Sequence, residues 1–140
     1  MEADWIAKAA KELDLPIRPL LADEQTQLLK RLEARFGLQT ATETVMAGDD
    51  HASLLRSDGW ERIADYVGDC ACVMFVGHPA QGFAFETGAQ LRATLGETPR
   101  MEFLVLDKAL TYALFANHHD FLLAWGAAKL WLAQFEEKAE

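Results

Sequence analysis

Apolar residues recur with helical spacing in two segments near the start of the chain. The first segment ends before Pro16, and the second begins at about Asp23 and ends at Phe36. Gly37 and Leu38 suit a left-handed C-terminal cap in which Leu38 folds back toward the helix. Two amphipathic helices are therefore expected, with apolar stripes made of Trp5, Ile6, Ala9, Ala10 and Leu13, and of Leu28, Leu29, Leu32 and Phe36.

A third helix is predicted after residues 39–56, which show neither helical nor strand periodicity. It begins after Ser57 or Asp58, where Glu61 completes a pattern resembling a capping box, and it ends at Gly68. The stretch before it is assigned no element. The apolar stripe of this helix consists of Trp60, Ile63, Ala64 and Val67.

Apolar runs of strand length dominate the second half of the chain. Residues 70–77 are apolar on both faces, which favours a central strand, and residues 82–86 are its expected neighbour. A short helix with Thr87 at its start follows, and then three strands and a closing helix over residues 127–138 with Ala127, Leu130, Trp131 and Phe135 as its apolar stripe. The pattern predicts a single α+β domain over residues 1–140, with a mainly antiparallel sheet of about five strands packed with N-terminal helices and a C-terminal helix.

The register of the last three strands decides which side chains share a face. Loops with even numbers of residues place Tyr112 and Phe121 on one face and Asp120 on the other. His119 then stands at the edge of the core. The predicted core face collects Met101, Phe103, Val105, Tyr112, Leu114, Phe121, Leu123 and Trp125, and the other face carries Glu102, Leu104, Leu106, Thr111, Ala113, Phe115, Asp120, Leu122 and Ala124.

The tetrapeptide Asn117-His118-His119-Asp120 is the first candidate site. Asn and His tolerate the left-handed backbone of tight hairpins, so Asn117 and His118 are explained as turn residues and His119 as a polar plug bonded to backbone or water. Catalysis or metal binding is the alternative. Because adjacent strand residues diverge, His118 and His119 would not share a metal unless the loop curls.

A second candidate site is the segment Asp49-Asp50-His51, which follows Gly48 in the unassigned stretch. Functional loops concentrate in such segments, and these side chains could supply acid–base groups or oxygen ligands. A solvated turn explains the same residues without chemistry. Both interpretations stay open, and no metal or cofactor is predicted.

The two cysteines, Cys70 and Cys72, are two residues apart in a predicted strand. Their side chains are expected on one face, with a spacing that is strained for a disulfide and too sparse for a zinc site. We interpret them as small buried thiols.

The charge balance narrows the classes of partner. The chain has 22 acidic and 13 basic residues, a formal net charge of −9, so nucleic acid and anionic membranes are not expected partners. A basic protein partner fits, because long-range attraction speeds encounter, although acidity also serves solubility. The chain start lacks the features of a signal peptide, and a cytoplasmic location is the default expectation.

The stretch "MEFLVLDKALTYALFANHHDFLLAWG", residues 101–126, resembles the C-terminal halves of small bacterial α+β proteins, including immunity proteins of polymorphic toxins. The resemblance rests on a strand pair with an Asn-His-(His/Asp)-Asp turn, followed by a strand that closes on glycine. It implies binding of a toxin and no catalysed reaction. Asn117, His118, His119 and Asp120 are the matching positions, and the resemblance gives none of them a role.

Three functional hypotheses follow from these observations. The first is a non-catalytic protein-binding module of the immunity type that neutralises a basic toxin or similar partner, with Trp60 and Trp131 as aromatic candidates for the contact. The second is a small cytosolic enzyme or metal-binding protein that uses residues 117–120 together with residues 49–51. The third is a structural or regulatory subunit that dimerises through a sheet face.

Overall fold

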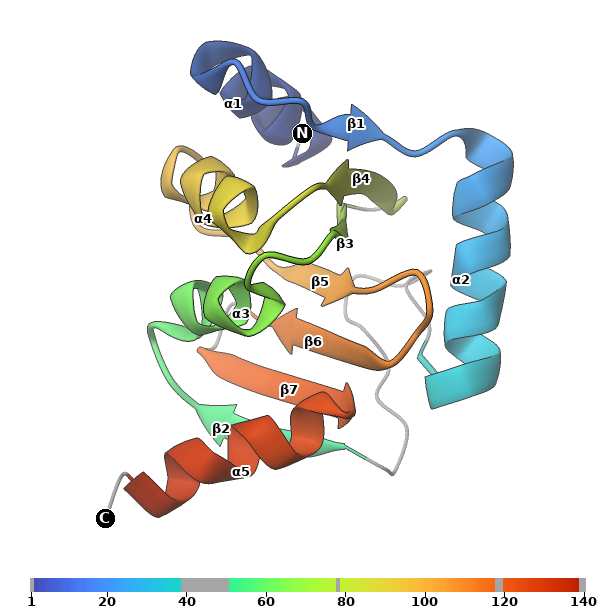
Figure 1. The fold of residues 1–140 in the computed structure, drawn as a ribbon. Helices are drawn as coiled ribbons and strands as arrows, with labels where there is room; N and C mark the ends of the chain where they lie inside the picture. Colours follow the sequence, from blue (N-terminus) through green and yellow to red (C-terminus); the bar gives the residue numbers. More distant parts are fainter. Residues whose placement is uncertain (1, 39–50, 78, 118–119, 139–140) are drawn as a thin grey trace.

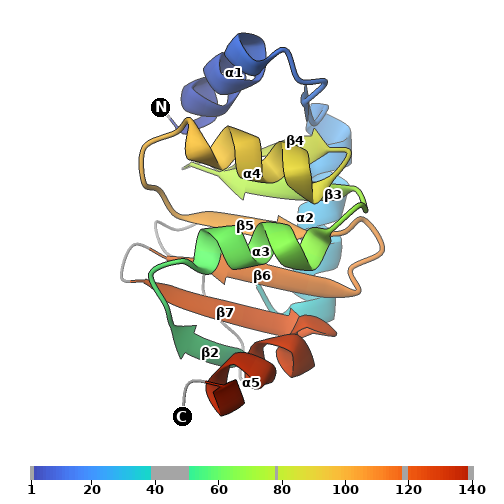
Figure 2. The same ribbon diagram turned by 60° about the vertical axis from the view of Figure 1, so that its left-hand side comes forward.

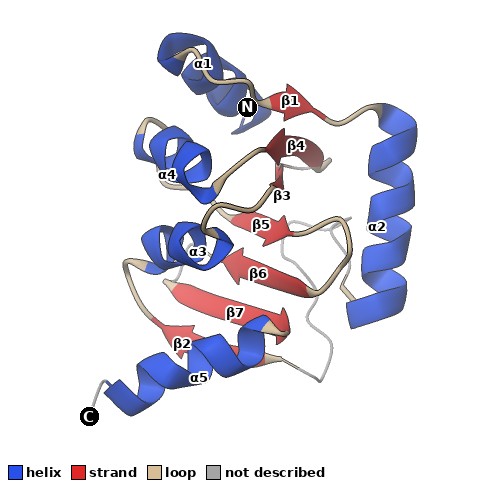
Figure 3. Cartoon of the chain, viewed as in Figure 1, coloured by secondary structure: helices blue, strands red, loops and turns tan. Residues whose placement is uncertain are grey.

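The computed structural model describes residues 2–38, 51–77, 79–117 and 120–138. Five helices and seven strands form in these residues (Figures 1 and 3). In chain order they are α1 (Glu2–Leu13), β1 (Arg18–Pro19), α2 (Ala22–Phe36), β2 (Ala52–Leu55), α3 (Gly59–Val67), β3 (Cys72–Val76), β4 (Gln81–Phe85), α4 (Gly88–Gly96), β5 (Phe103–Leu106), β6 (Tyr112–Ala116), β7 (Phe121–Gly126) and α5 (Ala128–Lys138).

All seven strands belong to one sheet with the order β1-β4-β3-β5-β6-β7-β2. Every neighbouring pair is antiparallel. The predicted α+β class and the mainly antiparallel sheet are therefore confirmed, although the sheet has two more strands than expected. The additional strands, β1 and β2, occupy the two edges.

Helices cover the two faces of the sheet unequally. Figure 2 shows α1, α4, α3 and α5 arranged one after another across one face, whereas α2 is the one described helix on the other face (Figure 1). Two buried clusters correspond to these faces. The larger contains Ile6, Ile63, Leu91 and Leu132 from the four helices, and the smaller contains Leu28 and Leu32 from α2.

The helix ends follow the local signals in the sequence, with one exception. Gly37 adopts a left-handed conformation (φ 70°) and caps α2, and Leu38 is buried in the cluster with Leu32, as predicted. The Thr87 hydroxyl accepts the Gln90 N–H at the start of α4. At α3 the predicted capping box is absent, because the Asp58 carboxylate accepts hydrogen bonds from the Arg56 guanidinium instead.

The predicted apolar stripe of the last helix is right in part, because Trp131 and Phe135 pack against the larger cluster. Leu130 is 79% exposed, whereas Ala128 and Leu132 are buried in the larger cluster. Three consecutive bulky residues, 130–132, allow two overlapping stripes, so the periodicity did not distinguish them. The cysteine prediction is also wrong in part, because Cys72 is buried and Cys70 is exposed.

The predicted sharing of faces is right for the first late connection and wrong for the second, and the predicted register of the first connection is two residues off. Val105 pairs with Leu114, two residues from the expected partner but with the same parity, so Phe103, Val105, Tyr112 and Leu114 share a face. In the next hairpin Ala116 pairs with Leu122. Tyr112 and Phe121 therefore lie on opposite faces of the sheet. On the face that carries Tyr112, β7 contributes Leu122 and Ala124 instead of the predicted Phe121, Leu123 and Trp125.

The physical cause of this error lies in the β6–β7 turn. The Asn117 N–H donates to the Phe121 carbonyl at 3.0 Å, so these two residues close the hairpin and an odd number of residues separates them. Asp120, at the end of the turn, has a left-handed backbone (φ 67°). Three-residue loops that end in a left-handed residue are a common hairpin class, and they reverse the parity that an even loop would give.

Candidate functional site

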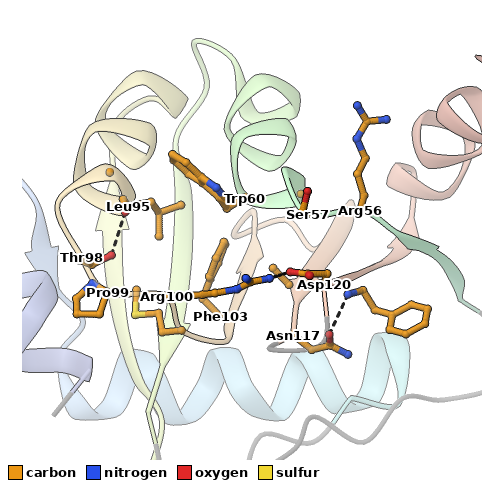
Figure 4. Close-up of a pocket in the computed structure, with 15 residues that line it drawn as sticks. Arg56, Ser57, Trp60, Leu95, Thr98, Pro99, Arg100, Phe103, Asn117 and Asp120 are labelled. Atoms are coloured by element: carbon orange, nitrogen blue, oxygen red, sulfur yellow. Dashed lines mark hydrogen bonds and ion pairs between the residues drawn. The ribbon is translucent and has the colours of Figure 1, made fainter. Parts of the chain in front are cut away.

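An open pocket lies where β5 begins and β6 ends (Figure 4). Its volume is about 320 Å³. The start of α3 forms one wall, the end of α4 and residues 98–101 form a second, and the tip of the β6–β7 hairpin forms a third. The apolar part of the lining is Gly59, Trp60, Leu95, Gly96, Pro99, Met101, Phe103, Ala116 and Phe121, and the polar part is Arg56, Ser57, Thr98, Arg100, Asn117 and Asp120.

Main-chain bonds bring the hairpin tip against the segment that precedes α3. The Asn117 side-chain oxygen accepts the Phe121 N–H at 3.0 Å, and the Asp120 N–H donates to the Asn117 carbonyl at 3.3 Å. The Arg56 N–H donates to the Asp120 carbonyl at 2.7 Å. Asn117 and Asp120 are thus tied to neighbouring residues by hydrogen bonds, and both line the pocket.

An ion pair between Arg100 and Asp120 spans the pocket. Figure 4 shows the Arg100 side chain extending past Phe103 to the carboxylate of Asp120 on the opposite wall. The Arg100 side chain is 65% exposed and that of Asp120 is 34% exposed. The pair therefore connects the loop after α4 to the hairpin tip through side chains that water also reaches.

A second group of ion pairs fixes the start of α3. Asp58 accepts from Arg56 through both carboxylate oxygens, at 2.5 and 3.2 Å, and its Oδ2 lies 3.7 Å from Arg62 Nε. The hydrogen bond from Arg56 is the main cause of a lowered Asp58 pKa. The Arg56 guanidinium lies 4.9 Å from the ring centroid of Phe135 in α5. Asp58 is therefore held as a carboxylate by two arginines.

His51 does not join the hairpin tip. Residues 52–55 of β2 pair with residues 124–121 of β7, so His51 lies at the opposite end of β2 from the turn, about 10–13 Å along the strand. Its ring centroid is 5.8 Å from that of Trp125. Of the other residues in the two candidate clusters, Asp49, Asp50, His118 and His119 lie outside the described residues.

Of the two cysteines, Cys72 is buried. Burial raises the pKa of the Cys72 thiol to about 12, so this sulfur remains protonated and unreactive at neutral pH. In the part of the chain that the structure describes, no group of three or more His, Cys, Asp or Glu side chains is arranged to hold a metal ion. The pocket offers hydrogen-bond donors and acceptors, exposed aromatic surface and ion-paired charges.

Asn117 and Asp120, two candidate residues in the sequence, line the pocket, whereas most of the other lining residues were not predicted. Arg56, Ser57, Thr98 and Arg100 carry no motif, and they come from segments far from residues 117–120 in the chain. Trp60 was singled out as an aromatic candidate, and it does line the pocket. No local sequence pattern marks Arg100 as a site residue. Its place in the pocket depends on β5 and β6 being neighbours in the sheet.

Comparisons with known proteins give no relative. No family model matches the chain, and no curated protein or solved structure matches it significantly. Among the described residues, no helix is long and apolar enough to cross a membrane.

Proposed function

We propose that this chain is a non-catalytic protein-binding module of the immunity type, and that its partner is a basic protein that binds around the pocket. The observation that carries the proposal is the combination of half-exposed aromatic side chains and ion-paired charges around one open pocket. Protein interfaces are typically built from such a centre of aromatic anchors with a polar rim. The pocket also contains Asn117 and Asp120, two positions of the segment that resembles immunity proteins.

Exposed apolar surface beside the pocket supports a binding role. Phe121 lines the pocket and is 41% exposed, and its cross-strand partner Leu55 is 64% exposed. Trp60 is half-buried at the start of α3. A contact that covers these side chains would bury apolar area now in contact with water, which favours association.

The overall charge supports a basic partner. A net charge of −9 on 140 residues attracts a positively charged surface and raises the rate of encounter at low ionic strength. Within the pocket itself the arginines are compensated by Asp58 and Asp120. The attraction would therefore come from the whole molecule, and specificity from the pocket.

Co-expression with the product of the neighbouring gene tests this function. We expect a stable 1:1 complex in size-exclusion chromatography with mass measurement, and relief of any toxicity of the neighbour. Phe121→Ala should weaken the complex at least about tenfold, since aromatic anchors dominate interfaces. Leu130→Ala is the matched control, because Leu130 is exposed on α5 away from the pocket lining.

Two outcomes would contradict the proposal. If the neighbouring product neither binds nor is neutralised, the immunity-type function fails. If the complex forms but Phe121→Ala binds as tightly as the wild type while Leu130→Ala does not, the partner binds a different surface.

A further inference from the structure

The pocket already accommodates a guanidinium group from the protein's own chain. The Arg100 side chain crosses the cavity and pairs with Asp120 on the far wall (Figure 4). Phe103 and Met101 line the same cavity, so the methylene groups of an arginine find apolar neighbours there. The site therefore has the size and the chemistry that an arginine side chain requires.

Arg100 holds this place weakly. It follows Thr98 and Pro99 in an exposed loop after α4, and its side chain is 65% exposed. Exposed ion pairs contribute roughly 0–1 kcal/mol, since water and salt screen them. A second guanidinium that also gained contacts outside the pocket could displace it.

Asp120 differs from Asp58, the other carboxylate at this end of the sheet. Asp58 is held by both Arg56 and Arg62, and its bonds to Arg56 are bidentate. For Asp120 the ion pair in the described structure is with Arg100. Its backbone is fixed by hydrogen bonds with Asn117 and Arg56, so the carboxylate stays in position when Arg100 leaves.

We infer that the pocket receives an arginine side chain of the protein partner, which replaces Arg100 beside Asp120. This inference rests on the proposed function, and it names the group that the partner inserts. Arginine is the occupant that we choose because Arg56 in the lining is already paired with Asp58, whereas the cation beside Asp120 belongs to the exposed Arg100 and can be replaced. Trp60 and Phe121 at the rim would contact the residues that flank the inserted arginine.

N-acetyl-arginine amide is the probe that tests the inference without the partner. Its binding to the full chain can be followed by NMR from the shifts of the Trp60 indole N–H and the Asn117 side-chain amide. We expect saturable binding to the wild type. Arg100→Ala should tighten binding about two- to fivefold, because it removes the internal competitor, and Asp120→Asn should abolish it.

The variants are chosen to keep the fold. Asn tolerates the left-handed backbone of position 120 as well as Asp does. Asp14→Asn is the matched control, because Asp14 is also an aspartate with a left-handed backbone (φ 53°), and it is exposed at the end of α1, away from the pocket lining. It should leave the affinity for the probe unchanged. N-acetyl-citrulline amide, the uncharged analogue, should not bind.

Several results would overturn the inference. Equal affinity for the citrulline probe would show that charge is not recognised, and unchanged binding by Asp120→Asn would show that this carboxylate is not used. Weaker binding by Arg100→Ala would show that Arg100 itself holds the ligand. If the probe fails while Phe121→Ala still weakens the complex with the neighbouring product, the inference fails and the proposed function stands.

Discussion

Strand β6 lies between two turns that share their main-chain hydrogen-bond pattern and differ in their surroundings. The Asp107 carbonyl accepts the Leu110 N–H at 3.0 Å in the first turn, and the Asn117 carbonyl accepts the Asp120 N–H at 3.3 Å in the second. Each turn contains a non-glycine residue in the left-handed region, Leu110 (φ 56°) before the strand and Asp120 (φ 67°) after it. Leu110 is 3% exposed and packs in the smaller apolar cluster. Asp120 is half-buried and faces the open pocket.

The contacts around the two turns differ. At the first turn the Asp107 carboxylate accepts the Thr111 N–H at 2.7 Å, the Thr111 carbonyl accepts the Ala127 N–H at 3.0 Å, and Tyr112 packs edge-on against Tyr66. At the second turn the Asn117 side-chain oxygen accepts the Phe121 N–H at 3.0 Å, and the Asp120 carboxylate pairs with the exposed Arg100 side chain. We call the end of the sheet with the buried Leu110 the closed end, and the end with the pocket the open end.

The largest expected effect on stability comes from adding a side-chain carbon at Gly126, at the closed end of the sheet. Gly126 has φ +66°, and an added Cβ would lie 2.4 Å from the Thr111 carbonyl oxygen and 3.1 Å from the Phe36 ring. Gly126→Ala should destabilise the fold by about 2–4 kcal/mol, from backbone strain and the clash together. Urea unfolding followed by tryptophan fluorescence measures the change.

Gly96 provides the matched control at the open end. It lies in the last turn of α4, where an added Cβ would meet no atom within 4 Å. Gly96→Ala should be neutral or stabilise by up to about 1 kcal/mol, because alanine is the better helix former. A loss of stability as large as that of Gly126→Ala would mean that the open end is packed as tightly as the closed one.

The second largest effect is expected at alkaline pH, where two groups at the closed end should lower the free energy of unfolding. Burial raises the pKa of the Cys72 thiol to about 12 and also raises that of the Tyr112 hydroxyl. Above about pH 9 the unfolded chain loses these protons while the folded chain keeps them, so stability falls by at most about 1.4 kcal/mol per pH unit for each group. Urea titrations between pH 8 and 11 should show the decline.

Cys72→Ala separates the two contributions. Without the thiol, the decline should begin near pH 10, the ordinary range of tyrosine, instead of pH 9. The variant loses some packing, which lowers the whole curve without changing its slope. A curve whose alkaline limb starts at the same pH as in the wild type would exclude Cys72 as the cause.

The sequence determined the helices of this fold better than its strand register. Gly37 and Gly68 mark helix ends by a local rule, because glycine adopts left-handed conformations without steric cost, and both helices end where predicted. Strand β7 carries apolar residues at five consecutive positions, 121–125, so its pattern does not alternate. Such a pattern contains no information on which residues face which layer.

The candidate site could be predicted only where its residues are close in sequence. Asn117 and Asp120 were found from turn chemistry, but the loop length depended on Asp120 adopting a conformation that glycine usually supplies. The second hypothesis predicts that Asp49, Asp50 or His51 approaches the hairpin tip. Asp49 and Asp50 lie outside the described residues, and His51 lies at the far end of β2, an edge strand that the sequence pattern did not reveal. Arg100 became a site residue only through the pairing of β5 with β6.

The smallest expected effect concerns the Arg100–Asp120 ion pair at the open end. Arg100→Ala and Asp120→Asn should each change the free energy of unfolding by less than about 0.5 kcal/mol, because both side chains are solvated and Asn keeps the left-handed turn. The coupling energy from the double-mutant cycle should lie below about 1 kcal/mol and decrease with added salt. Urea unfolding of the four proteins at low and high ionic strength measures it. A coupling above 2 kcal/mol would place this pair among the contacts that hold the fold together, and the pocket end would then resemble the closed end, with an arginine too firmly bound for a partner to replace.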